Sequence, residues 1–117
     1  MENRNLDEET FIPPLSVRAT AERGLRLREE APSSKKGGTN VGIARARDLA
    51  NGRPVTISTI KRMVSFFARH EGNQKKPAGV KYDPGQISWK LWGGDEGKRW
   101  ANKMLEEYIE ENENDEQ

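Results

Sequence analysis

The chain contains no cysteine, only one histidine and no long apolar run. Without cysteine, neither a disulfide framework nor a thiolate metal site can form, and nothing indicates an oxidising compartment. Apolar stretches of a few residues exclude a transmembrane helix, and the polar, acidic N-terminus lacks the basic start and apolar run of a signal peptide. We therefore expect no membrane association and a location in the cytoplasm.

Apolar residues are also scarce, because 32% of the chain is hydrophobic and 33% is charged. This balance lies near the lower limit at which burial offsets chain entropy. The 117 residues suffice for one compact domain. We expect a helical domain at 12–110, between a flexible N-terminal arm at 1–11 and an acidic flexible tail at 111–117, with both ends disordered.

Apolar spacing predicts helices and gives no alternation strong enough to predict a sheet. The expected helices are 15–30, a second from Thr39 or Asn40 to about 50, a third from the hydroxyl-rich 56–59 to about 70, a short one near 85–92, and a last one capped by Asp95. The fold class expected is all-α, a single compact domain of four or five helices.

The clearest apolar stripe lies in the third helix, where Ile60, Met63, Val64 and Phe67 recur at helical spacing. Three tryptophans could form a platform on which single-stranded bases stack, but in a chain with so few aliphatic residues they are better explained as core mass. Trp92, beside a glycine turn, is expected to show an edge. The expected core is Leu49, Ile60, Met63, Phe67, Trp89, Leu91, Trp92 and Trp100.

Charge is divided unevenly along the chain, although the formal net charge is only +1. Residues 31–80 hold ten Lys and Arg against two Asp and Glu, whereas residues 101–117 hold one against seven. A basic centre of this kind indicates a polyanion or an acidic protein surface as partner. The alternative is a solvated surface with a solubilising tail.

Residues 47–63 resemble a helix-turn-helix, a motif in which spaced apolar residues pack two helices across a short turn. Pro54 departs from the pattern, because glycine is usual at that position, and Asn51-Gly52 closes the first helix early. The same spacing also occurs in ordinary helical bundles. The residues that match are Leu49, Ala50, Val55, Ile60 and Met63.

No set of catalytic groups can be assembled from the sequence. His70 and Glu71 are sequence neighbours, which do not converge on one point of a helix, and His70 is better explained as a residue at a helix C-terminus. The glycine pairs 37–38 and 93–94 lack the context of a phosphate-binding loop. We expect no enzyme activity, no catalytic residue, no metal site and no cofactor.

Three segments resemble an uncharacterised domain family of bacteriophage and prophage proteins. They are 38–52 (GTNVGIARARDLANG), 59–71 (TIKRMVSFFARHE) and 87–101 (ISWKLWGGDEGKRWA), and with the preceding helix they cover about residues 15–105. In that family the domain stands alone or is joined to head-maturation or other virion proteins. The resemblance implies a phage origin, and hence the host cytoplasm or the virion as location, but implies no activity.

The leading hypothesis is a phage nucleic-acid-binding accessory protein, with duplex DNA as the main ligand. The second is a virion or head-assembly adaptor that docks on an acidic phage or host protein surface. Phosphate contacts are expected from basic residues and base contacts from the first turn of the third helix. The candidate residues are Lys35, Lys36, Arg53, Ser58, Thr59, Lys61, Arg62, Arg69, Lys75 and Lys76.

Overall fold

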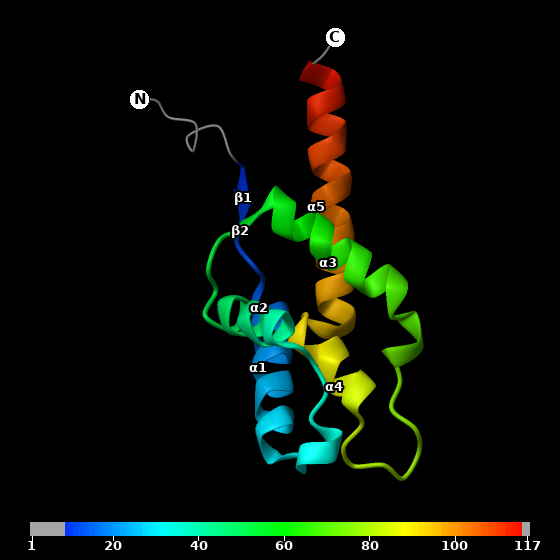
Figure 1. The fold of residues 1–117 in the computed structure, drawn as a ribbon. Coiled ribbons are helices and arrows are strands. Elements are labelled where there is room, and N and C mark those ends of the chain that lie inside the picture. The colour runs from blue at the N-terminus through cyan, green and yellow to red at the C-terminus, as the bar shows by residue number, and fades with distance from the viewer. Residues whose placement is uncertain (1–8, 116–117) are drawn as a thin grey trace.

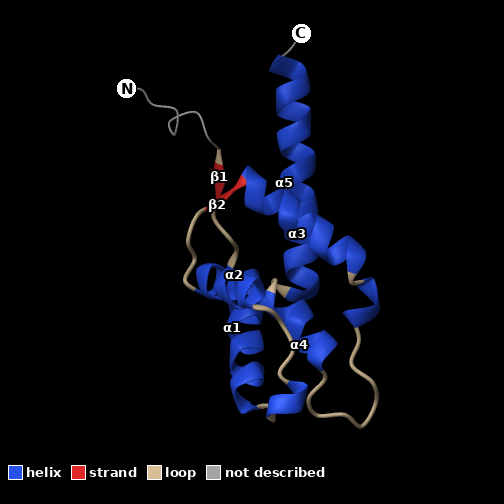
Figure 2. Ribbon diagram, viewed as in Figure 1, coloured by secondary structure: helices blue, strands red, loops and turns tan. Residues whose placement is uncertain are grey.

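A computed structural model describes residues 9–115, and in them the expected all-α fold is confirmed (Figures 1 and 2). Five α-helices carry most of the described residues, with two short 3₁₀ turns and one two-stranded sheet. The elements run in the order β1 (Thr10–Phe11), α1 (Leu15–Glu30), η2 (Ser33–Lys35), α2 (Asn40–Ala50), β2 (Val55–Thr56), α3 (Ile57–Arg69), η3 (Glu71–Asn73), α4 (Pro84–Leu91) and α5 (Gly94–Asp115).

Side-chain caps fix where three of these helices begin. Thr39 Oγ1 accepts a hydrogen bond from the Gly42 amide at 3.1 Å, and Thr56 Oγ1 accepts one from the Thr59 amide at 3.2 Å. Asp83 does the same for α4. The cap predicted for the last helix is wrong, because α5 already includes Gly94 and the Asp95 carboxylate has another partner. Caps satisfy amides that a first turn leaves without acceptors.

Helix α1 is the central packing partner, against which α2, α4 and α5 lie, while α3 packs on α5 (Figure 1). Gly24 permits the close approach of α1 and α4. A Cβ built at Gly24 would lie 2.8 Å from the Leu91 amide nitrogen, closer than real Cβ atoms approach. The α4–α5 corner needs glycine for another reason, since Gly93 and Gly94 have φ of 109° and 66°.

All eight predicted core residues are buried, which confirms that the tryptophans are core mass. Phe66 and Ile87 were not predicted as core residues, although both are buried. The remaining buried apolar residues are small or β-branched and come from α1 and the residue after it, α2, β2 and α5: Val17, Ala21, Ala31, Ala46, Val55 and Ala101.

The two-stranded sheet was not expected. Thr10 pairs with Thr56 and Phe11 with Val55 in antiparallel register, and half-buried Phe11 packs against the core. Strands of two residues are too short to show alternation, which explains why the sequence does not predict them. The end of the expected flexible arm is therefore part of the fold, while its residues 1–8 lie outside the described residues.

Helix α5 also differs from expectation, because it continues through the predicted tail to Asp115. Its C-terminal half extends beyond the other helices (Figure 1), and the molecule measures 53 × 28 × 21 Å. Acidic residues oppose the helix dipole at this end. Glutamate is nevertheless a strong helix former, and its propensity outweighs that local cost here. Residues 116–117 of the expected tail lie outside the described residues.

The helix-turn-helix-like segment occurs as a helix, a turn and a helix, but α2 and α3 are not each other's main packing partners. Helix α2 packs on α1 and α4, α3 packs on α5, and β2 separates the two in sequence. Leu49, Ile60 and Met63 are fully buried in the common core. The apolar spacing thus reflects burial in the bundle.

Candidate functional site

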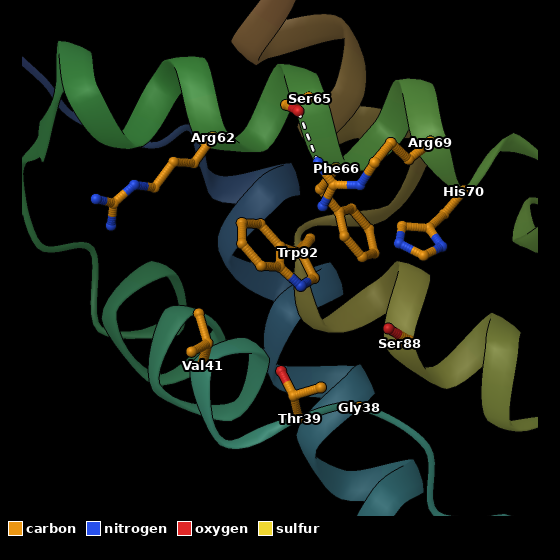
Figure 3. Close-up of a pocket in the computed structure, with 10 residues that line it drawn as sticks. All are labelled: Gly38, Thr39, Val41, Arg62, Ser65, Phe66, Arg69, His70, Ser88 and Trp92. Atoms are coloured by element: carbon orange, nitrogen blue, oxygen red, sulfur yellow. Dashed lines mark hydrogen bonds between the residues drawn. The ribbon is translucent and has the colours of Figure 1, made fainter.

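A cavity of about 440 Å³ lies between the start of α2, the underside of α3 and the α4–α5 corner (Figure 3). This volume is within the range of sites that hold small ligands. Arg62 and Arg69 come from α3, Thr39 and Val41 from the start of α2, and Trp92 from the corner. None of the ten described residues that line the cavity is acidic.

Helix α3 presents its cationic residues to the cavity because its apolar face is taken by the core. Ile60, Met63 and Phe67 point inward, which leaves Arg62, Ser65 and Arg69 along one side of the helix. Arg69 Nη1 donates a hydrogen bond to Ser65 Oγ at 2.7 Å (Figure 3). A guanidinium has five N–H donors, so Arg69 retains donors for a ligand.

The floor of the cavity is aromatic. Phe66 and Trp92 stack with ring centroids 4.6 Å apart and planes 11° apart, and the His70 ring lies 4.7 Å from that of Phe66. Phe66 is 5% and Trp92 8% exposed. Trp92 is stacked on Phe66 and is buried, so this indole is not an open stacking platform. Trp100 is 9% exposed, so exposure does not single out Trp92 as the tryptophan that shows an edge.

Arg45 of α2 adds positive charge beside this floor. Its guanidinium lies 5.6 Å from the Trp92 ring centroid, and its Nε is buried without a hydrogen-bond partner among the described residues. Burial lowers the pKa of Arg45, Asp48 at 4.0 Å counteracts that shift, and nearby Arg62 adds to it. Two arginines are therefore held close together beside the cavity.

Of the predicted site residues, only Arg62 and Arg69 line this cavity. Lys61 is exposed like Arg62, but it lies toward α5, with its Nζ 6.0 Å from the Tyr108 ring centroid. Consecutive helical residues are about 100° apart, which accounts for the separation of Lys61 from Arg62.

Three further candidates, Arg53, Ser58 and Thr59, lie before or at the start of α3. The hydroxyl of Thr56 donates to that of Thr59 at 3.3 Å, and the Thr59 amide completes the cap, so Thr59 belongs to the α3 N-terminus. Ser58 is exposed on the same turn. Arg53 is paired with Asp48 at 3.1 Å.

The lysines of the two loops lie away from the cavity. Lys36 Nζ donates to the carbonyls of Arg28, Glu29 and Ala31, so the predicted phosphate contact is replaced by a cap on α1. All three donors of this ammonium are in use. Lys35 is exposed at the end of η2.

Lys75 and Lys76 belong to the loop between α3 and α4, where both are exposed. Lys76 borders a separate cavity of about 260 Å³, which is also lined by Arg23 and Lys90. Burial lowers the pKa of Lys90, and Arg23 adds to that shift more than Lys76 does. The ten predicted residues therefore do not form one surface.

Several cavity residues were missed as functional candidates. Thr39 and Val41 appear in the sequence as a cap and an apolar position, and Ser88 as part of a short helix. Nothing in the local sequence indicates that the start of α2 faces α3, because that contact arises from packing of both helices in the bundle. The one available signal is the proximity of arginines to aromatic residues in 62–70.

Comparison with family models, with curated proteins and with solved structures found no match. In residues 9–115, no helix is long and apolar enough to span a bilayer. The same residues contain no group of three or more His, Asp or Glu side chains placed to hold a metal ion.

Proposed function

We propose that the chain is a non-catalytic, nucleic-acid-binding accessory protein of a bacteriophage or prophage. It acts in the host cytoplasm or in the virion and binds duplex DNA through α3. The observation that carries the proposal is the exposed pair Arg62 and Arg69 on one side of α3, above a cavity without acidic residues.

These two arginines are seven residues apart, which corresponds to about 10 Å along a helix axis. Guanidinium groups at such spacing contact phosphates of a nucleic-acid backbone, and Arg45 raises the local positive potential. Lys61, Thr59 and Lys36 are not part of this interface, because each has a partner elsewhere in the fold.

The test is a fluorescence-anisotropy titration with random duplex DNA, single-stranded DNA and RNA at several salt concentrations. Each phosphate contact contributes about −0.9 to the slope of log affinity against log salt for duplex DNA. Removing both arginines (Arg62→Gln with Arg69→Gln) should therefore make the slope shallower by about 1.8 and weaken binding of all duplex sequences alike.

Lys61→Gln is the matched control, because it removes one positive charge from the same helix on the side that faces Tyr108. It should change the slope much less than Arg62→Gln does. Absence of binding to all three nucleic acids at low salt would exclude this function.

The second candidate is a virion or head-assembly adaptor. It is favoured by Ile12 and Leu15, which are three residues apart in the chain, before and at the start of α1, and are 62% and 75% exposed. Exposed apolar surface is typical of protein interfaces. Binding to phage particles that is lost in Leu15→Ser and retained in Arg62→Gln would favour the adaptor.

A further inference from the structure

We propose that the cavity beneath α3 is a specific binding site for the phosphate monoester of a nucleotide. The inference rests on the proposed function and goes beyond backbone contact. The phosphate can belong to a free nucleoside monophosphate or to the 5′ end of a strand, and both present the same chemistry. The cavity offers hydrogen-bond donors, positive charge and apolar surface to such a ligand.

The first observation is an unused donor. Trp92 as a residue is more than nine-tenths buried, and its Nε1–H makes no hydrogen bond with any of the described residues. Figure 3 shows this nitrogen turned into the cavity, toward Thr39. Trp89 offers the contrast, since its Nε1 donates to Asp95 at 2.9 Å. Arg45 Nε is the only buried side-chain nitrogen or oxygen of the described residues without a partner, so Trp92 Nε1–H is open to the cavity and available to an acceptor on a ligand.

The second observation is the helix terminus that faces this donor. Helix α2 has eleven residues, and its N-terminus forms the cavity wall at Thr39 and Val41. The Thr39 hydroxyl satisfies the Gly42 amide, which leaves the amides of Asn40 and Val41 at the first turn without an intrahelical acceptor. A Cβ at Gly42 would lie 3.2 Å from Trp92 Nε1, so glycine leaves space beside the indole nitrogen. First-turn amides and the helix dipole together favour an anion.

The third observation is the matched charge. Arg62 and Arg69 line the cavity from the α3 side, opposite the start of α2. A phosphate monoester carries more negative charge than an internal phosphodiester and accepts bidentate hydrogen bonds from guanidinium groups. An anion between α2 and α3 would therefore have donors on two sides.

The remaining surface selects a ligand with an apolar, planar part. Val41 is 59% exposed at the rim, and the edges of Phe66 and Trp92 form the floor. Inorganic phosphate would leave this surface in water, whereas a base next to Val41 and Phe66 would cover it. A cavity of about 440 Å³ accommodates such a ligand.

The experiment follows the three indole N–H resonances of the full-length, ¹⁵N-labelled protein during titration. The probes are a nucleoside 5′-monophosphate, the corresponding nucleoside and inorganic phosphate. We expect the Trp92 resonance to shift with the monophosphate, less with inorganic phosphate and not with the nucleoside, while the Trp89 resonance stays in place. A Trp92 resonance that none of the probes moves, or that the nucleoside moves equally, would overturn the proposal.

Variants test the individual donors. Arg62→Gln should weaken monophosphate binding about tenfold or more, whereas Lys61→Gln should change it less than about twofold. Trp92→Phe keeps an aromatic ring against Phe66. It removes the N–H donor and reduces the size of the ring system. It should weaken monophosphate binding while the unfolding transition stays cooperative. Equal affinity of the Arg62 and Lys61 variants would contradict the site.

Oligonucleotides with a 5′-phosphate and a 5′-hydroxyl distinguish the source of the ligand. Tighter binding of the phosphorylated strand identifies a strand end, whereas equal binding together with a monophosphate-dependent Trp92 shift identifies the free nucleotide. Salt-dependent duplex binding without any Trp92 shift would overturn the cavity site and leave the proposed function intact. A Trp92 shift with the monophosphate but no binding of any nucleic acid would overturn the proposed function and leave the cavity site intact.

Discussion

The ring of Phe66 stacks on the indole of Trp92 at 4.6 Å and thereby joins α3 to the corner between α4 and α5. Phe66 also meets Phe67 edge-on at 5.4 Å and lies 6.3 Å from Trp89. This one side chain thus links the floor of the cavity to the aromatic part of the core. The packing of the core and the shape of the cavity floor therefore both depend on the contact between Phe66 and Trp92.

Phe66→Ala should lower the free energy of unfolding by about 3–5 kcal/mol, because it removes a buried ring and leaves a cavity under Trp92. Urea unfolding followed by circular dichroism measures the change. Val41→Ala is the control, since Val41 is exposed at the rim and its truncation should change stability by less than about 0.5 kcal/mol. Equal stability of the two variants would show that the stacked pair contributes little.

Gly24→Ala should destabilise the protein even though alanine favours helix by about 1 kcal/mol over glycine. The new Cβ would lie 2.8 Å from the Leu91 amide nitrogen and 2.9 Å from the Lys90 carbonyl carbon, and backbone atoms cannot move aside as a flexible side chain does. Separation of α1 and α4 costs about 1–3 kcal/mol, typical of overpacking. A thermal melt compares it with Gly72→Ala, where no atom lies within 4 Å and a near-neutral effect is expected.

Lys36→Met should lower stability by about 1–2 kcal/mol, because the Lys36 ammonium donates to three carbonyls at the end of α1. Lys35→Met removes the same charge from the neighbouring exposed position and should have little effect. The difference between their unfolding midpoints in urea isolates the cap. If both variants lose equal stability, the loss of a positive charge is responsible and the cap contributes little.

Helix positions and the core were predictable because they depend on short-range signals. The stripe of Ile60, Met63 and Phe67 fixes the inner face of α3, and Thr39 marks the start of α2 by its own hydrogen bond. Such signals lie within one or two turns of the chain. The eight predicted core residues follow from them.

The site was only partly predictable, because the position of a charged residue in the sequence does not show toward which part of the fold its side chain points. Arg62 and Lys61 are adjacent in the chain, yet one lines the cavity and the other lies by Tyr108. Lys36 was expected to contact phosphate, but carbonyls at the end of α1 use its donors. Contacts of this kind depend on tertiary packing, which the periodicity of apolar residues does not reveal.

A substitution at Asp48 changes the charge near the cavity without changing a residue that lines it. The Asp48 carboxylate forms ion pairs with two arginines: Oδ2 lies 4.0 Å from Arg45 Nη1, and Oδ1 lies 3.1 Å from Arg53 Nη1. Asp48→Asn removes the one interaction that raises the Arg45 pKa, since burial and Arg62 both lower it. Arg45 remains charged at neutral pH, because arginine stays protonated in proteins. The net effect is one more uncompensated positive charge beside the cavity.

If the proposed interface is correct, Asp48→Asn should therefore tighten nucleic-acid binding by about twofold to fivefold at low salt, which corresponds to the energy of an exposed charge pair. Anisotropy titrations at low and high salt measure this, and the gain should shrink as salt screens the added charge. Glu110→Gln removes the same charge from the C-terminal half of α5 and serves as the control. A gain as large in the Glu110 variant would mean that net charge, and not the surface around α3, controls binding.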